Sequence, residues 1–145
     1  MASWKEQTLI DAPVEDVWKL LEDPSRFPEW NGETIAVTGV PTKIEKGSSF
    51  DVTGRGPFGV KATTTFKVEE LEDLHEIKMR CQTSGWYSHW FLTEAQGRTF
   101  TQVEMGVESI PGLEGRIAGA MHTKGYLRRT LHKTLDSLRG TLSRP

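Results

Sequence analysis

Residues 10–30, with the sequence IDAPVEDVWKLLEDPSRFPEW, contain the signals that decide the fold. Pro13 suits the first position of a helix, and Glu15 suits the positive end of a helix dipole. The apolar residues that follow recur at helical spacing, which predicts a short helix with one apolar face: Val14, Val17, Trp18 and Leu21. Asp23-Pro24 ends this helix and can cap a second short one, in which Phe27 and Trp30 would be buried.

On both sides of these helices the sequence alternates in the manner of β-strands. A first strand is predicted over residues 4–10, before the helices. Turn-forming residues then recur at regular intervals and divide the middle of the chain into further strands. The links between these strands have hairpin length, so the sheet should be antiparallel. The further strands are predicted at 34–39, 48–54, 60–71, 75–82, 86–94 and 99–108.

The end of the chain changes from strand periodicity to helix periodicity. Its leucines step by four, four, three and four residues along one helix face: Leu127, Leu131, Leu135, Leu138 and Leu142. Leu113, Ile117 and Met121 continue a similar face upstream, so a single helix is predicted from about Gly112 to Gly140, roughly 42 Å long at 1.5 Å per residue. The predicted fold class is therefore α+β: a curved seven-stranded antiparallel sheet wrapped around a long C-terminal helix, with two short helices between the first and second strands.

Length and composition limit the classes of protein to which the chain can belong. Its 145 residues fit one domain, 1–145, and a net charge of -2 provides no overall basic field for nucleic acid. The single cysteine, Cys81, excludes a disulfide within the chain and suits a reducing cytoplasm. No apolar segment follows the first residues, and no apolar run approaches the ~20 residues of a membrane span. We therefore expect a cytoplasmic protein without a signal peptide.

The strands predict an internal cavity. A strongly twisted sheet curls, and one helix covers only part of its concave face, so the gap is filled by large side chains or left open for a ligand. Because alternate strand residues share a face, one register is mostly apolar and the other carries lysine and glutamate. For residues 86–94 the register stays open, because Tyr87 and Phe91 lie opposite Trp86 and Trp90 and a shift of one residue would reverse the faces.

The stretch Ile10-Asp11-Ala12-Pro13-Val14-Glu15-Asp16-Val17-Trp18 resembles the start of the SRPBCC superfamily (START-like, polyketide cyclase/dehydrase). Residues 21–30 continue this likeness, and the order of elements is similar over nearly the whole chain. The resemblance implies a helix-grip fold with a deep cavity under the C-terminal helix. It also implies a ligand such as a lipid, sterol, polyketide, quinone or plant hormone, since members bind such molecules and some are cyclases or hydratases. No catalytic set can be carried over from it.

The leading prediction is binding or transport of a hydrophobic small molecule (a lipid, polyketide, quinone or similar) in this cavity, without a cofactor. Apolar side chains would remove the ligand from water, and the hydroxyls of Thr64 and Ser88 would orient it. The predicted ligand-binding residues are Trp30, Phe50, Thr64, Phe66, Met79, Trp86, Ser88, Trp90, Met105, Ile117 and Met121.

Two other classes of function stay open. A polyketide or aromatic cyclase or dehydratase would need an acid/base pair in the same cavity, and His122 and Glu6 are the candidates, although no catalytic motif is present. Glu6 would lie either at the sheet edge in water or in the cavity as a polar anchor. A toxin-like interaction module of a toxin–antitoxin pair is the third class. The scattered histidines and lone Cys81 predict no metal site.

The C-terminal helix carries two further features. Its glycines at 112, 115, 119 and 125 weaken the first half, so residues 109–125 either form a mobile gate over the cavity mouth or pack closely against the sheet. Its cations are expected to be solvated rather than to contact a membrane: Lys124, Arg128, Arg129, Lys133 and Arg139. The expected partner is thus a hydrophobic small molecule and no nucleic acid, and the chain would be a monomer or a homodimer.

Overall fold

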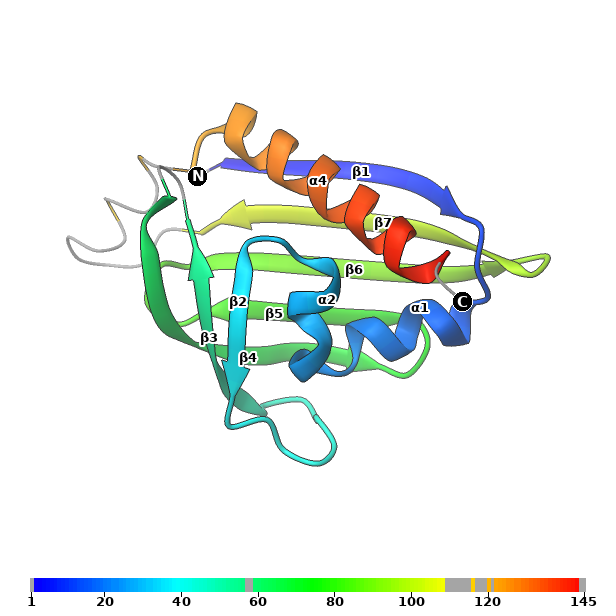
Figure 1. The fold of residues 1–145 in the computed structure, drawn as a ribbon, viewed down its shortest axis with the longest axis horizontal. Helices are drawn as coiled ribbons and strands as arrows, with labels where there is room; N and C mark the ends of the chain where they lie inside the picture. The colour runs from blue at the N-terminus through cyan, green and yellow to red at the C-terminus, as the bar shows by residue number, and fades with distance from the viewer. Residues whose placement is uncertain (1, 57–58, 109–115, 117–119, 121, 144–145) are drawn as a thin grey trace.

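A computed structural model describes residues 2–56, 59–108, 116, 120 and 122–143 of the chain. A single antiparallel sheet curves around the helices (Figure 1). The elements in chain order are β1 (Ala2–Ile10), α1 (Val14–Leu21), the 3-10 helix η1 (Pro24–Arg26), α2 (Phe27–Trp30), β2 (Thr34–Thr38), β3 (Ser49–Arg55), β4 (Lys61–Glu72), β5 (Glu76–Cys81), β6 (Trp86–Ala95), β7 (Arg98–Val107) and α4 (Lys124–Leu142).

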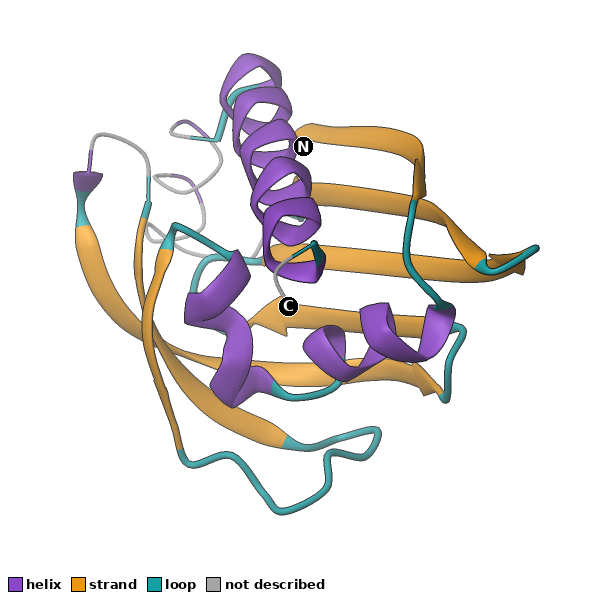
Figure 2. Cartoon of the chain, turned by 45° about the vertical axis from the view of Figure 1, so that its right-hand side comes forward, coloured by secondary structure: helices purple, strands orange, loops and turns teal. Residues whose placement is uncertain are grey.

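The sheet has seven strands in the order β1-β7-β6-β5-β4-β3-β2. Every pairing is antiparallel, and β1 joins β7, so that the first strand of the chain lies beside the last. The strands bend around the concave face, on which α1, α2 and α4 all lie (Figure 2). The predicted fold class, with two short helical segments between the first two strands, is confirmed.

The N-terminal helices form where the local signals predicted them, with one shift. Pro13 has extended geometry and precedes the first helical residue, Val14, so it does not occupy the first helical position. The side chain of Asp23 caps η1 by accepting a hydrogen bond from the Ser25 N–H at 3.1 Å. The buried indole N–H of Trp30 donates to the carbonyl of Leu20 at 3.1 Å, which fixes α2 against α1.

The C-terminal helix begins later than the periodicity predicted. Thr123 has extended geometry, and its hydroxyl accepts a hydrogen bond from the Tyr126 N–H at 3.2 Å, so α4 starts at Lys124. The prediction of one unbroken helix from residue 112 to 140 is therefore wrong at Thr123. At 1.5 Å per residue the 19 residues of α4 extend about 28 Å. Apart from Gly125, the predicted gate lies outside the described residues or at the isolated positions 116, 120 and 122–124.

The leucine stripe of α4 is the part of the helix that enters the core. Leu127, Leu131, Leu135 and Leu138 are all buried. At its far end the Thr141 hydroxyl donates to the carbonyl of Glu29 at 3.0 Å, which connects α4 to α2. The helix thus closes one side of the concave face and leaves space beside it.

The register of β6, left open by the sequence, has Trp86, Ser88 and Trp90 on the concave face. Tyr87 lies on the convex face but is also buried, because Lys78 and Arg80 each cover its ring at 5.2 Å. Gly106 of β7 leaves room for this ring, since a Cβ there would lie 2.8 Å from the Tyr87 hydroxyl. Aromatic side chains therefore lie on both faces of β6, which is why the alternation of residues alone could not decide the register of this strand.

Candidate functional site: an internal cavity with a polar mouth

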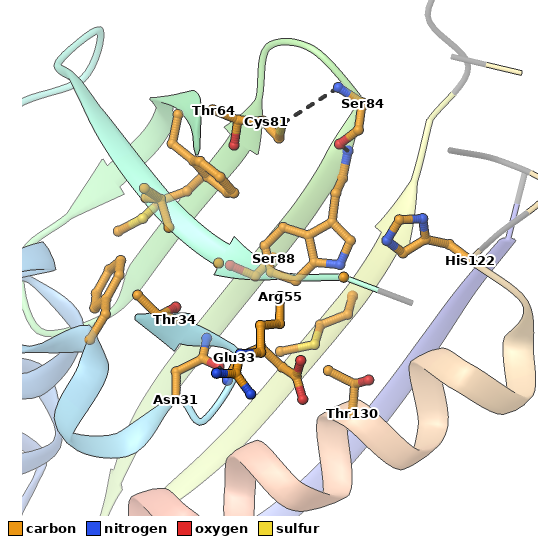
Figure 3. Close-up of a pocket in the computed structure, with 18 of the residues that line it drawn as sticks. Asn31, Glu33, Thr34, Arg55, Thr64, Cys81, Ser84, Ser88, His122 and Thr130 are labelled. Atoms are coloured by element: carbon orange, nitrogen blue, oxygen red, sulfur yellow. Dashed lines mark hydrogen bonds between the residues drawn. The ribbon is translucent and has the colours of Figure 1, made fainter. Parts of the chain in front are cut away.

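A cavity of about 250 Å³ lies between the concave face of the sheet, α2 and the start of α4. Its wall is mostly aromatic and aliphatic, with polar groups gathered at a few points (Figure 3). The lining residues are Leu21, Phe27, Trp30, Asn31, Glu33, Thr34, Val52, Gly54, Arg55, Gly56, Val60, Ala62, Thr64, Phe66, Ile77, Met79, Cys81, Ser84, Trp86, Ser88, Trp90, Met105, His122, Tyr126 and Thr130.

The floor of the cavity is a row of side chains across three neighbouring strands. Ser88 of β6 lies opposite Met79 of β5 on one side and opposite Met105 of β7 on the other. Flexible thioethers on both sides of one hydroxyl make a surface that adapts to an apolar molecule and offers it a single hydrogen bond.

Aromatic pairs hold the walls in place. The rings of Trp30 and Trp90 meet edge to face with centroids 5.8 Å apart, and the rings of Phe66 and Trp86 meet at the same distance at 66°. Such contacts stabilise the arrangement beyond the burial of apolar area. The wall is therefore preformed, so ordering it would cost a ligand little binding energy.

Six polar or charged lining residues, here called the mouth of the cavity, come from three separate parts of the chain. Asn31 and Glu33 come from the segment between α2 and β2, and Arg55 comes from the end of β3. His122, just before α4, and Thr130 of α4 are labelled in Figure 3, and Tyr126 of α4 also lines the cavity. The side chains of Glu33 and Arg55, of opposite charge, and the hydroxyl groups of Tyr126 and Thr130 thus line the same cavity.

Tyr126 connects the polar mouth with the interior. Burial raises the pKa of its phenol, and the nearby Glu33 carboxylate raises this pKa further, while a hydrogen bond with the Thr130 side chain acts in the opposite direction. The ring of His122 packs edge to face on the Tyr126 ring, with centroids 5.5 Å apart. Tyr126 therefore stays a neutral hydroxyl at physiological pH and can donate a hydrogen bond at the mouth.

A glycine sets how closely β2 approaches β3 at the mouth. The backbone N–H of Arg55 donates to the carbonyl of Glu33 at 2.7 Å. A Cβ on the neighbouring Gly54 would lie only 2.8 Å from that same carbonyl oxygen. Glycine at position 54 therefore permits the close pairing that brings Glu33 and Arg55 to one opening.

Eight of the eleven predicted ligand-binding residues line the cavity: Trp30, Thr64, Phe66, Met79, Trp86, Ser88, Trp90 and Met105. The prediction that Phe50 lines it is wrong. Phe50 is buried, with its ring centroid 6.2 Å from that of Phe27 and 6.3 Å from that of Phe66, and these two neighbours line the cavity in its place. Ile117 and Met121 lie outside the described residues.

The two candidate catalytic residues are not brought together. His122 lines the cavity, whereas Glu6 of β1 does not. Glu6 accepts a hydrogen bond from the indole N–H of Trp4 at 2.7 Å, and Nε2 of His132 lies 2.6 Å from the same carboxylate oxygen. The Trp4 bond, with His132 beside it, lowers the pKa of Glu6. Glu6 therefore lies at the sheet edge, and the pairing of Glu6 with His122 as acid and base is wrong.

Most residues of the mouth were not predicted from the sequence. Glu33, Arg55, Tyr126 and Thr130 are far apart in the sequence and match no motif. One available signal was Thr123, a good helix cap directly before the leucine stripe, which would have placed Tyr126 in the first turn of α4. The position of Glu33 and Arg55 had no local signal, because it depends on the pairing of β2 with β3.

The described part of the chain contains no group of three or more histidine, cysteine, aspartate or glutamate side chains that could hold a metal ion. None of its helices has the length and apolar character needed to cross a membrane.

Comparison with known proteins places the chain in a family. Residues 1–143 match the family described as polyketide cyclase/dehydrase and lipid transport. No curated protein matches the chain. Among solved structures, a START superfamily protein from Mycobacterium smegmatis is similar with a TM-score of 0.75 and 16% identity, over 97% of this chain and 96% of that one.

The Zhui aromatase/cyclase from Streptomyces sp. R1128 is similar with a TM-score of 0.75 and 16% identity, over 99% of this chain and 94% of that one. A protein from Arthrobacter aurescens has a TM-score of 0.71 and 18% identity, over 99% and 87% of the two chains. At these identities the three solved structures show a shared fold alone. The family is shown by the match of residues 1–143 to the family model. The chain therefore belongs to the polyketide cyclase/dehydrase and lipid transport family, with the helix-grip fold of START-like proteins.

Proposed function

We propose that the chain binds or carries a mostly apolar small molecule in the cavity between the sheet and α4. The observation that carries this proposal is a cavity of about 250 Å³ whose wall is mostly aromatic and aliphatic, with a few polar side chains. Burial of apolar ligand surface against such a wall contributes about 25 cal/mol per Å², before the costs of association are subtracted.

The size of the cavity limits the ligand. An apolar cavity of about 150 Å³ holds a benzene molecule. At about 250 Å³ this cavity has room for a fused ring system of two rings or for a short acyl chain. A larger molecule would extend through the mouth, where Glu33, Arg55 and Tyr126 would meet its polar end.

Polar groups inside the cavity would fix the orientation of the ligand. Thr64 and Ser88 face the interior from β4 and β6, and each offers a hydroxyl that can donate or accept. The ligand would therefore combine a flat or flexible apolar body with one or two oxygen or nitrogen atoms.

Binding can be tested with a pair of matched variants. Ala62 lines the cavity, whereas the adjacent Thr63 lies on the opposite face, where its hydroxyl lies 2.7 Å from that of Thr53. We expect Ala62→Phe to weaken binding of an apolar fluorescent probe, anilinonaphthalene sulfonate, at least tenfold, and Thr63→Phe to leave it within twofold. Equal binding by both variants would place the probe elsewhere and contradict the proposal.

The natural ligand can be sought in protein purified from its own host. Native mass spectrometry of the unmodified chain should show a co-purifying molecule of low mass, and the Ala62→Phe variant should lose it. Protein that carries no bound molecule and takes up none from a lipid or quinone mixture would argue against a carrier.

A second candidate function is that of a polyketide or aromatic cyclase or dehydratase. His122, Tyr126 and Glu33 gather at the mouth and could exchange protons with a bound molecule, and one similar structure is that of an aromatase/cyclase. His122→Ala should then abolish the formation of an aromatic product from a linear polyketide thioester, measured by absorbance, while binding of the apolar probe persists. Unchanged turnover in His122→Ala would remove this candidate.

The remaining expectations stay predictions. They are a single domain over 1–145, a cytoplasmic location, the absence of a cofactor and a monomeric or homodimeric state. A toxin-like interaction module would be indicated by a stable protein partner that binds with the cavity empty.

A further inference from the structure

The wall of the cavity carries a single permanent positive charge. Among the described residues that line it, Arg55 of β3 is the only lysine or arginine. Arg26, Arg80 and Arg139 are each paired with a carboxylate elsewhere in the fold. In the described part of the chain no ion pair involves Arg55. Its guanidinium therefore borders an apolar cavity without a carboxylate of the protein bound to it.

Asn31 offers a second donor close to this guanidinium. Its Oδ1 accepts a hydrogen bond from the backbone N–H of Glu33 at 3.1 Å, which fixes the orientation of the amide. The backbone N–H of Arg55 donates to the carbonyl of the same Glu33 at 2.7 Å, so Asn31 and Arg55 are held on the same short segment of β2. Figure 3 shows the Arg55 side chain extending toward those of Asn31 and Glu33. The NH₂ group of Asn31 is thus available to a ligand that pairs with Arg55.

The Glu33 carboxylate limits the charge that a ligand can carry here. It raises the pKa of Tyr126 on α4 and forms no ion pair with Arg55 among the described residues, so it would repel an anion without neutralising the guanidinium. One guanidinium near one carboxylate suits a head group with a single negative charge better than a phosphate monoester, which carries nearly two.

A cationic head group fits the mouth less well than an anionic one. Five of the six mouth residues carry an N–H or O–H donor, and Glu33 alone carries none at neutral pH. The planar fork of an arginine also matches the two oxygens of a carboxylate.

We propose that the ligand is a monocarboxylate with an apolar body, whose carboxylate pairs with Arg55 and accepts a hydrogen bond from Asn31. This inference rests on the proposed function, because the apolar wall has to hold the body of the ligand. It adds the charge and the chemical class of the head group. A neutral molecule of the same shape would lose the attraction of Arg55 and bind more weakly.

Three naphthalenes that differ in charge test this inference by isothermal titration calorimetry at pH 7. They are 2-naphthoate, 2-naphthamide and 2-naphthylmethylammonium, which are negative, neutral and positive at this pH. Naphthalene is the fused body of two rings for which the cavity of about 250 Å³ has room. The test variants are Arg55→Gln and Glu33→Gln. The control is Arg98→Gln, which removes the same charge at an exposed position of β7 outside the cavity.

We expect the parent chain to bind 2-naphthoate at least fivefold more tightly than 2-naphthamide, and the ammonium most weakly. Hydrogen bonds to charged groups contribute about tenfold or more, and the exposure of Arg55 reduces this figure. Arg55→Gln should weaken 2-naphthoate at least fivefold and leave 2-naphthamide within threefold. Glu33→Gln should bind 2-naphthoate more tightly than the parent, because a repelling charge is removed. Arg98→Gln should leave all three affinities within threefold.

The neutral probe separates failure of this inference from failure of the proposed function. Equal affinity for 2-naphthoate and 2-naphthamide, an equal loss in Arg55→Gln and Arg98→Gln, or tightest binding of the ammonium would overturn the inference while the cavity still binds an apolar body. Binding of none of the three naphthalenes would refute the proposed function and the inference with it. Retained affinity for 2-naphthamide in Arg55→Gln, with an unchanged circular dichroism spectrum, shows that this variant folds.

Discussion

Replacement of Gly54 by alanine tests the close approach that builds the cavity mouth. The new Cβ would lie 2.8 Å from the backbone oxygen of Glu33, a separation that real Cβ atoms do not tolerate, so β2 and β3 must move apart. Overpacking of this kind typically costs about 1–3 kcal/mol. For 145 residues the entropy of unfolding is about 0.3 kcal/mol per K, so the melting temperature should fall by about 3–10 °C.

The matched control is Gly140→Ala in α4. A Cβ there meets nothing within 4 Å, and alanine in a helix is favoured over glycine by up to about 1 kcal/mol, so this variant should melt at a higher temperature than the parent. Differential scanning calorimetry measures both shifts, and titration with the apolar probe shows whether Gly54→Ala also weakens binding. A Gly54→Ala protein that melts at or above the parent temperature would refute the reasoning.

Three further predictions follow from the packing and the charges. Leu131→Ala, at a fully buried position of α4, should lower the free energy of unfolding by about 2–5 kcal/mol in urea titrations. Because bonding to Trp4 and His132 lowers the pKa of Glu6 in the folded state, the parent chain should be more stable than Glu6→Gln above the ordinary carboxyl pKa, by up to about 1 kcal/mol. This advantage should vanish as the pH falls through the lowered value, and an advantage that persists at pH 2 would contradict it. Burial raises the pKa of Tyr87 to about 12, so the folded chain keeps a proton that the unfolded chain loses above pH 10. Stability should then decline between pH 10 and 12 in the parent chain and less steeply in Tyr87→Phe, as followed by circular dichroism.

Local patterns predicted the elements well where one face is strongly apolar. The stripe at Val14, Val17 and Leu21 predicted α1, and the leucines of α4 predicted its buried side. A helix that buries one side needs apolar residues at the helical spacing, so the sequence shows that spacing. The boundary at Thr123 was missed because Leu113, Ile117 and Met121 continue the apolar spacing across it. Periodicity reports which side of a segment is apolar, but it does not report an extended residue within the segment.

The interior of the cavity was predicted better than its mouth. Trp86, Ser88 and Trp90 share a face through the two-residue period of a strand, so they could be predicted as a set, but only the structure shows that this face of β6 lines the cavity. Phe50 obeys the same period and is buried against Phe66, yet it does not line the cavity, since alternation gives the face of a residue and not whether it borders open space.

From its residues alone, this chain specifies a bent antiparallel sheet, short helices after the first strand, an apolar concave face and a leucine-striped final helix. These features are encoded by neighbours a few residues apart, through backbone geometry and the exclusion of apolar surface from water. Only the tertiary structure decides that Glu6 pairs with His132 at an edge, and that Glu33, Arg55 and Tyr126 meet at one opening. Strand pairing and helix docking bring those groups together although they are tens of residues apart in the sequence. A pattern of neighbouring residues carries no information about such contacts.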